Sequence, residues 1–312
     1  MAATTELNEC SEHAAVESEA ADRGLSTEVR KPSTPVRARS QDTPRVSILT
    51  CCRNLDLFYG TELIFKTLRV GFPNACVSVV DNCSVPEARS EIESLAKQTG
   101  CRFSAVSDSP LSHDRFIQKT IRDAAEDADF EGPLVFVDPD VCLWESWEDV
   151  HFDGLVAGKL VGRFFDPVTQ TVTMPRLHTS LLWIPDPTKL WEAVLRIKST
   201  RFDFEPFLSC SVHLDGTWYR YDTGASLYAA LPDRLSRFEE RHLDGYDHIY
   251  AGSHLDWVFD SYDEPCQRMF SQVHGAVRAG DLDALRGIWR YQDAVFHRSI
   301  RGSQRESSHR RS

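Results

Sequence analysis

The chain has 312 residues, of which 41% are hydrophobic and 26% are charged, so it has enough apolar material for one large domain or two modest ones. Its 35 Lys and Arg against 47 Asp and Glu give a formal net charge of −12, which argues against a nucleic-acid partner, because such binding comes mainly from neutralising phosphates. No apolar run reaches the roughly 18 residues that cross a bilayer, and the N-terminal segment does not look like a signal peptide, so we expect a soluble, cytoplasmic protein without an integral membrane segment.

Two polar segments flank the part of the sequence that shows structural periodicity. Residues 1–43 contain almost no large apolar residue, and residues 301–312 are polar and basic. Such segments bury too little apolar surface to fold, so we expect two disordered tails around one domain at residues 44–300. The nine cysteines include no C-x-x-C pair, and we expect buried thiols in a reducing compartment.

The first half of the domain alternates between strand-like and helix-like patterns. Short apolar runs predict four strands, at residues 46–50, 76–81, 102–106 and 134–137. Apolar side chains at helical spacing predict helices at residues 57–70, after Pro86 and after Ser112. This order favours a parallel sheet with right-handed crossovers, in which ligands bind beyond the carboxyl ends of the strands.

The second half of the domain is less regular. Strand-like pieces occur at residues 155–164, 171–174 and 180–184, and helical patterns occur at residues 187–197 and 281–296. We expect these pieces to complete the same sheet. The predicted fold class is therefore α/β, a three-layer, Rossmann-like domain with a mainly parallel central sheet and a mixed C-terminal half.

Two carboxylates follow the apolar run at 134–137. Asp138 and Asp140 are separated only by Pro139, and residues i and i+2 of an extended segment project to the same side. They can therefore converge on one hard cation, Mn²⁺ or Mg²⁺, together with a diphosphate. The alternative is a polar turn that merely closes the strand.

At this point the sequence resembles the glycosyltransferases of the GT-A fold, especially the family 2-like nucleotide-diphospho-sugar transferases. The resemblance covers residues 45 to about 260 as an order of features. It rests on the segments Val46–Asn54 and Val79–Ser84 and on the D-x-D triplet, although typical members have a small or acidic residue in place of Pro139. It implies a GT-A-like domain, Mn²⁺ or Mg²⁺ as cofactor and a nucleoside-diphosphate sugar as donor. The acceptor stays open among a glycan, a small molecule and a protein, and so do the donor sugar and the stereochemistry.

The resemblance also implies roles for residues at the strand ends. Thr50, Arg53 and Asp81 would contact the nucleotide, and Asp138 would bind both the metal and the sugar nucleotide. Arg115, near the start of a predicted helix, can approach the diphosphate beside the amides of that helix end. The alternative readings are structural: Asp81 caps the following helix. Thr50 and Arg53 are ordinary loop residues, with Arg53 in a surface salt bridge, and Arg115 is exposed to solvent.

A single acid among aromatic residues is the candidate catalytic base. Asp222 follows Trp218–Tyr221. The resemblance implies an acid in the part of the chain after the D-x-D triplet, which takes the proton of the acceptor hydroxyl. Asp215 competes for this role. Alternatively, Asp222 caps the helix that begins near Ser226.

Two late histidines are candidate metal ligands. His248 precedes the pair Gly252–Ser253 and His254 follows it. The resemblance implies a histidine near such a Gly-Ser turn that binds the metal or the diphosphate. Neutral imidazole is a competent ligand for Mn²⁺.

Two other functions remain open. An apolar strand followed by D-x-D also resembles phosphatases of the haloacid dehalogenase superfamily, in which Asp138 would attack phosphorus and Asp140 would handle the leaving-group proton. The third possibility is a non-catalytic GT-A-like domain that binds a ligand through its aromatic second half.

Overall fold

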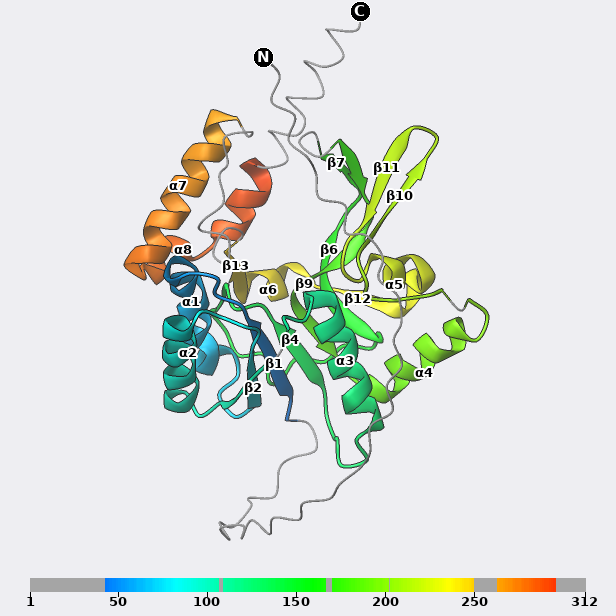
Figure 1. Ribbon diagram of the computed structural model, residues 1–312, viewed down its shortest axis with the longest axis horizontal. Helices are drawn as coiled ribbons and strands as arrows, with labels where there is room; N and C mark the ends of the chain where they lie inside the picture. Colours follow the sequence, from blue (N-terminus) through cyan, green and yellow to red (C-terminus); the bar gives the residue numbers. More distant parts are fainter. Residues whose placement is uncertain (1–42, 107–108, 167–169, 202, 250–262, 296–312) are drawn as a thin grey trace, which may run out of the picture. The chain divides into compact units, whose positions relative to one another are not determined.

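The computed structural model describes residues 43–106, 109–166, 170–201, 203–249 and 263–295 (Figure 1). The tails expected at residues 1–43 and 301–312 lie outside these ranges, apart from Thr43. None of the described helices is long and apolar enough to cross a membrane.

A seven-stranded sheet, in the order β12-β6-β9-β4-β1-β2-β3, lies at the centre of the fold. Four neighbouring strands are parallel: β1 (Arg45–Thr50), β2 (Cys76–Asp81), β3 (Arg102–Ala105) and β4 (Leu134–Val137). The second half of the chain adds β6 (Val156–Val161), β9 (Arg176–Ile184) and β12 (Leu235–Arg237), of which β9 runs antiparallel to both of its neighbours. The expected α/β class with a mainly parallel sheet and a mixed C-terminal half is therefore confirmed.

Helices cover both faces of this sheet (Figure 1). One face packs against α1 (Leu55–Gly71) and α2 (Pro86–Gln98), and the other against α3 (His113–Glu126) and α4 (Pro187–Lys198). The helix α7 (Glu264–Ala279) packs against α1. Strand β4 shows how the layers arise, because its side chains alternate between the two hydrophobic clusters. Val135 and Val137 belong to the first cluster, whereas Leu134 and Phe136 belong to the second.

Smaller elements surround the carboxyl edge of the parallel strands. A four-stranded sheet contains β10 (Cys210–Leu214), β11 (Thr217–Tyr221), β8 (Thr171–Thr173) and β7 (Phe164–Asp166). A two-stranded sheet pairs β13 (Tyr246–His248) with β5 (Val141–Leu143). Three short helical pieces complete this half: α5 (Ala225–Ala230), η1 (Pro232–Arg234) and α6 (Glu240–Asp244).

Three sequence-based expectations need correction. The helix expected at 281–296 is interrupted, because α8 (Leu282–Leu285) ends before Gly287, whose φ of 78° is left-handed, and a new helical stretch covers residues 288–295. The strand expected at 155–164 is split between β6 and β7, and β7 pairs with β8, the strand expected at 171–174, in the four-stranded sheet rather than in the central one. Among the described cysteines, Cys51 and Cys210 are exposed rather than buried.

Candidate metal and nucleotide site

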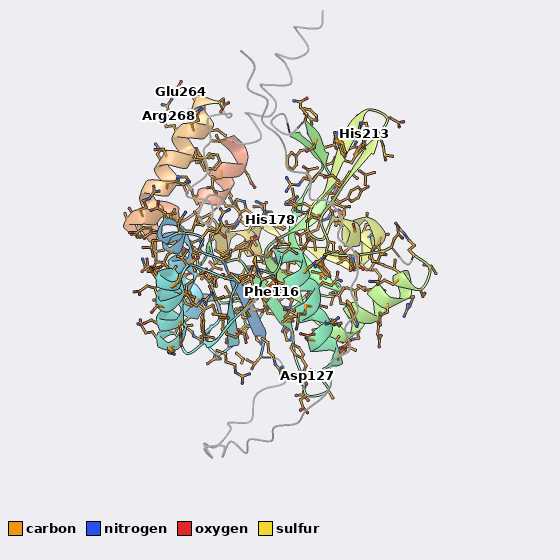
Figure 2. The ribbon with its side chains drawn as sticks, viewed as in Figure 1. Phe116, Asp127, His178, His213, Glu264 and Arg268 are labelled. Carbon is orange, nitrogen blue, oxygen red and sulfur yellow. The ribbon has the colours of Figure 1, made fainter. Side chains whose placement is uncertain are left out.

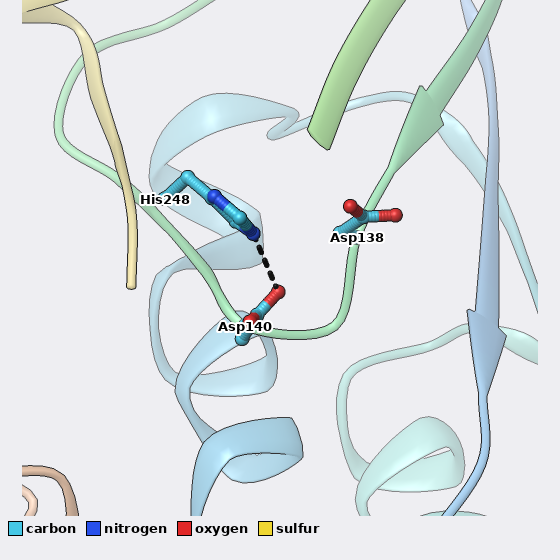
Figure 3. A group of neighbouring side chains, drawn as sticks. All are labelled: Asp138, Asp140 and His248. Carbon is cyan, nitrogen blue, oxygen red and sulfur yellow. Dashed lines mark ion pairs between the residues drawn. The ribbon is translucent and has the colours of Figure 1, made fainter. Parts of the chain in front are cut away.

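Asp138, Asp140 and His248 form the one group of three or more potential metal ligands found among the described residues (Figure 3). One ligand atom of each lies within 4.8 Å of the ligand atoms of the other two. His248 Nε2 is 3.3 Å from Asp140 Oδ1, and the Asp140 side chain is only 2% exposed. The site thus brings together three of the four residues that the sequence suggested as metal ligands, while His254 lies outside the described residues.

Backbone hydrogen bonds fix the positions of these ligands. The Asp138 N–H donates to the carbonyl of Ser180 in β9, at 2.8 Å, and the Ile249 N–H donates to the carbonyl of Asp140, at 2.9 Å. In the two-stranded sheet, His248 stands opposite Val141, directly after the acidic pair. The end of β4 and the end of β13 are therefore held side by side.

Asp247, next to His248, ties this edge to the C-terminal helical segment. Its Oδ2 accepts hydrogen bonds from Trp144 Nε1 and the Gly287 N–H, both at 2.6 Å, and its Oδ1 accepts one from the Trp289 N–H at 2.7 Å. Asp247 is 3% exposed. Its three hydrogen bonds offset the cost of burying a carboxylate.

Three aromatic rings pack beside the acidic pair. The ring centroids of His178 and His248 are 4.9 Å apart, and the Trp289 ring lies 5.4 Å from His248 and 5.5 Å from His178. His178, labelled in Figure 2, comes from β9 and accepts a hydrogen bond at Nδ1 from the Ser180 N–H. A neutral His178 therefore carries its proton on Nε2.

The three site histidines have different pKa values because their neighbours differ. Burial favours neutral imidazole, but the Asp140 carboxylate outweighs burial and raises the pKa of His248. In the same way, the Asp138 carboxylate, with its Oδ1 3.1 Å from Nε2, outweighs burial and raises the pKa of His113. For His178, burial and the nearby His248 act together and hold the pKa well below its usual value.

A cavity of about 420 Å³ opens over the acidic pair. Its lining includes Arg53, Asn82, His113, Asp138 and Asp140. Positive and negative side chains therefore face one volume at the carboxyl ends of β1 and β4, where doubly wound folds bind ligands.

The residues expected to contact a nucleotide differ in their surroundings. Arg53 is exposed and lines the cavity, whereas Thr50 and Asp81 are completely buried. The Asp81 carboxylate accepts hydrogen bonds from Arg89 Nε at 2.8 Å and from the Ser84 N–H at 3.2 Å, so it holds the start of α2 against β2. Nucleotide contacts by these residues stay predictions.

The first turn of α3 presents His113 to the cavity, while the expected phosphate ligand Arg115 is exposed and is not among the residues that line it. Asn82 shapes this region, because its side chain accepts from the Leu111 N–H and donates to the Leu111 carbonyl, both at 2.7 Å. Sequence reasoning missed His113. The predicted helix start near Ser112 was the available signal, because it places the first helical residue at the sheet edge.

Asp222 is held by an ion pair, and not by a helix cap. Arg176 Nη2 lies 2.9 Å from Asp222 Oδ2, and the Asp222 side chain is 26% exposed. The cap of α5 is Gly224, without a side-chain hydrogen bond, so the capping role expected as an alternative for Asp222 is wrong. The Asp222 carboxylate also contributes to the raised pKa of His113.

The donor set at Asp138, Asp140 and His248 fits a divalent cation. Carboxylate oxygens suit Mg²⁺ and Mn²⁺, and an imidazole nitrogen is compatible with Mn²⁺. Three protein ligands leave positions for phosphate oxygens in six-fold coordination. The Asp140 carboxylate lies 3.3 Å from His248 Nε2, so the two side chains already face one another at this place.

Comparisons with known proteins gave structural neighbours only. No protein-family model matches the chain, and no curated protein sequence matches it. Among solved structures, the chain is similar to the glycosyltransferase GlyE of Streptococcus pneumoniae TIGR4, with a TM-score of 0.38 and 10% identity over 64% of this chain. It covers 46% of the GlyE chain, so it spans about half the length of this neighbour.

Two further neighbours were solved with ligands. The galactosyltransferase LgtC in complex with donor and acceptor sugar analogues has a TM-score of 0.39 and 10% identity, over 74% of this chain and 95% of LgtC. The mannosyltransferase PcManGT of Pyrobaculum calidifontis, with GDP-Man and Mn²⁺, has a TM-score of 0.34 and 14% identity, over 81% of this chain and 69% of its own.

Proposed function

We propose that this protein is a metal-dependent glycosyltransferase that moves a sugar from a nucleoside-diphosphate sugar to an acceptor hydroxyl. The observation that carries the proposal is the convergence of Asp138, Asp140 and His248 at a cavity of about 420 Å³ that the two carboxylates line. A cation held by these ligands would be Mn²⁺ or Mg²⁺, and it would offset the charge that develops on the departing diphosphate.

The side chains around the metal ligands have distinct tasks in this reaction. Arg53 and His113 line the cavity and supply positive charge for the diphosphate oxygens. Asp222 accepts the proton of the acceptor hydroxyl in an inverting reaction. The acceptor oxygen then forms the new bond to the anomeric carbon, and the old carbon–oxygen bond breaks with its electron pair leaving on the diphosphate.

The test is metal-dependent nucleotide binding by charge-neutral variants. We expect Mn²⁺ with a nucleoside diphosphate to raise the melting temperature of the wild type, because a ligand that binds only the folded state stabilises it. Asp138→Asn and Asp140→Asn should each lose this stabilisation. Removing a residue that only hydrogen-bonds to a metal ligand already lowers metal affinity by about 10- to 100-fold. These variants remove the negative charge of a ligand itself, so their loss of affinity should be at least as large.

Asp153→Asn is the matched control, because Asp153 is exposed and lies outside the cavity lining. It should behave as the wild type. Retention of Mn²⁺-dependent binding in both site variants would exclude the metal role of the acidic pair. Nucleotide-sugar binding without any transfer across an acceptor panel would indicate a binding domain, and a phosphoaspartate at Asp138 would indicate a phosphatase.

A further inference from the structure

A second cavity, of about 350 Å³, lies at the far end of the two-stranded sheet from the acidic pair. Strand β5 leads from Asp140 to Leu143, and residues that line this cavity follow from Glu145. Strand β13 leads from Gly245, which also lines the cavity, to His248. Three residue pairs join the two strands, so the ribbon between the two sites is about 10 Å long.

The buried part of the cavity wall holds an N–H group without an acceptor. Trp147 lines the cavity and is 2% exposed, and its Nε1 has no hydrogen-bond partner among the described residues. A Cβ built on Gly245 would lie 3.5 Å from this nitrogen, so the N–H is close to another lining residue. A buried donor without a partner is rare in folded proteins, and it commonly marks the place of a water or an ion or ligand.

His242 supplies a second donor to the same wall. This side chain lines the cavity, is 8% exposed, and accepts the Glu239 N–H at Nδ1, at 3.0 Å. Burial and the nearby Arg241 lower the pKa of His242, so the ring is neutral and its one proton is on Nε2. The buried wall therefore offers two N–H groups to acceptor oxygens.

Carboxylates stand at the exposed part of the wall. Glu145 and Asp149 line the cavity, are exposed, and form no ion pair with the other described residues. Arg241 also lines the cavity, but its Nε lies 3.0 Å from Glu239 Oε2, so its positive charge is already paired. The cavity therefore combines buried donors with a rim that carries a net negative charge.

A hydroxyl group suits both parts of the wall, because it accepts one hydrogen bond while it donates another. It can accept from Trp147 Nε1 or His242 Nε2 and donate to a carboxylate of the rim. A simple anion would meet the two carboxylates, and a simple cation would meet the two buried N–H groups. A neutral molecule with several hydroxyl groups has neither conflict.

We propose that this cavity binds one neutral sugar ring, a hexopyranose that is free or part of a glycan. A cavity of about 150 Å³ holds benzene, so about 350 Å³ has room for a six-membered ring with its hydroxyl groups. The sugar is bound and not transformed here, because the metal ligands lie at the other end of the ribbon. This binding does not depend on the proposed glycosyltransferase function, since no metal or sugar donor takes part in it.

The test follows the indole N–H of Trp147 by NMR on the full chain with ¹⁵N-labelled tryptophans. Trp147→Phe identifies its signal among the seven tryptophans, because that signal disappears. Titration with the methyl glycosides of glucose, galactose and mannose should move this signal, with saturation for at least one sugar, because an indole N–H that gains an acceptor changes its chemical shift. The same shift should be seen when Mg²⁺ and a nucleoside diphosphate are present, because the two cavities are separate.

Asp149→Asn and Asp153→Asn are the matched variants. Both aspartates are exposed on the connection between β5 and β6, and of the two only Asp149 lines the cavity. Asp149→Asn should weaken sugar binding about fivefold, because a hydrogen bond to a charged acceptor is roughly twice as strong as one to a neutral acceptor. Asp153→Asn should bind the sugar as the wild type does. Ligand-observed saturation transfer measures these affinities without the Trp147→Phe variant.

Four results would overturn this assignment. The first two are a Trp147 signal that none of the three glycosides moves, and equal sugar affinities of Asp149→Asn and Asp153→Asn. The third is movement of the signal by glycine or acetate at lower concentration than by any glycoside, which would assign the cavity to a zwitterion or an anion. The fourth is displacement of the sugar by Mg²⁺ and a nucleoside diphosphate, which would place the sugar over the acidic pair instead.

Discussion

Asp222 illustrates how one ion pair can hold a carboxylate ready for chemistry. Its Oδ2 faces Arg176 Nη2, and its Oδ1 accepts a hydrogen bond from the Thr223 N–H at 3.0 Å. We expect Asp222→Asn to leave nucleotide affinity near the wild-type value and to reduce sugar transfer by roughly 100-fold or more, the usual effect of removing a general base. Melting temperature, donor affinity and turnover, measured on the same preparations, check this.

Asp215→Asn is the control for that experiment. Asp215 was the competing candidate for the base, and the structure places it in the turn of the β10–β11 hairpin with a φ of 49°. Asparagine tolerates this left-handed conformation, so the variant should fold and transfer sugar normally. Full activity of Asp222→Asn would exclude the base role, and loss of activity in Asp215→Asn would reverse the order of the two candidates.

The sequence alone does not show which of His113 and Arg115 lines the cavity. Both lie in the first turn of α3, and a charged arginine is the more obvious phosphate ligand. Only the rotation of the helix about its axis decides that His113 lines the cavity and that Arg115 is exposed. That rotation depends on the packing of Phe116 and Ile117 into the core, which the apolar spacing indicates.

At the scale of elements, Asp247 connects β13 to the C-terminal helical segment. Asp247→Asn replaces one carboxylate oxygen with an NH₂ group, which donates and cannot accept. At least one of the three N–H groups that bond to the wild-type carboxylate would then face another N–H and lose its acceptor. We expect a loss of about 3 kcal/mol in the free energy of unfolding, the scale of a buried hydrogen bond to a charged group. Amide hydrogen exchange at residues 287–295 should accelerate.

The same variant should weaken Mn²⁺ binding, because Trp289 would no longer be held against His248. Asp283→Asn is the control, since Asp283 is exposed on α8 in the same segment. It should change neither hydrogen exchange nor metal affinity. Unchanged exchange at 287–295 in Asp247→Asn would show that other contacts dock this segment.

Elements with strong periodicity were predictable, and elements defined by a single backbone conformation were not. The strand at 134–137 and the helix at 57–70 follow from unbroken apolar patterns, and the structure contains both. The break at Gly287 could not be read in the same way, because glycine occurs within helices as well as after them and only its φ of 78° distinguishes the two.

At the scale of the whole molecule, local alternation predicts the layers, whereas contacts distant in sequence complete the site. Strands and helices in regular order indicate a parallel sheet, and that order places Asp138 and Asp140 at its carboxyl edge. The partner of the acidic pair could not be chosen from sequence. His248 is brought to the acidic pair by contacts such as the hydrogen bond from Trp144 to Asp247, the residue before it. That bond joins residues 103 positions apart, and no local sequence pattern indicates such a pairing.

Acid stability tests whether the charge of Glu205 links α3 to α4. Glu205 accepts hydrogen bonds from Lys198 of α4, at 2.8 Å, and from Gln118 of α3, at 2.9 Å. Burial would raise the pKa of Glu205, but these hydrogen bonds outweigh burial and lower its pKa below the ordinary value of 4.5. The unfolded chain therefore takes up this proton first as the pH falls, and the stabilisation, complete above pH 4.5, is lost through the lower pKa of the folded state.

Glu205→Gln removes this titration and keeps most of the side-chain shape. The wild type should exceed the variant in unfolding free energy at pH 6 by on the order of 0.5 kcal/mol, since the pair is partly exposed, and the two curves should converge by about pH 3. Urea unfolding across this range measures the difference directly. Glu192→Gln, an exposed change on α4, should run parallel to the wild type. A constant offset between the wild type and Glu205→Gln would mean that the charge of Glu205 does not link the two helices, because only a titrating interaction can make the difference depend on pH.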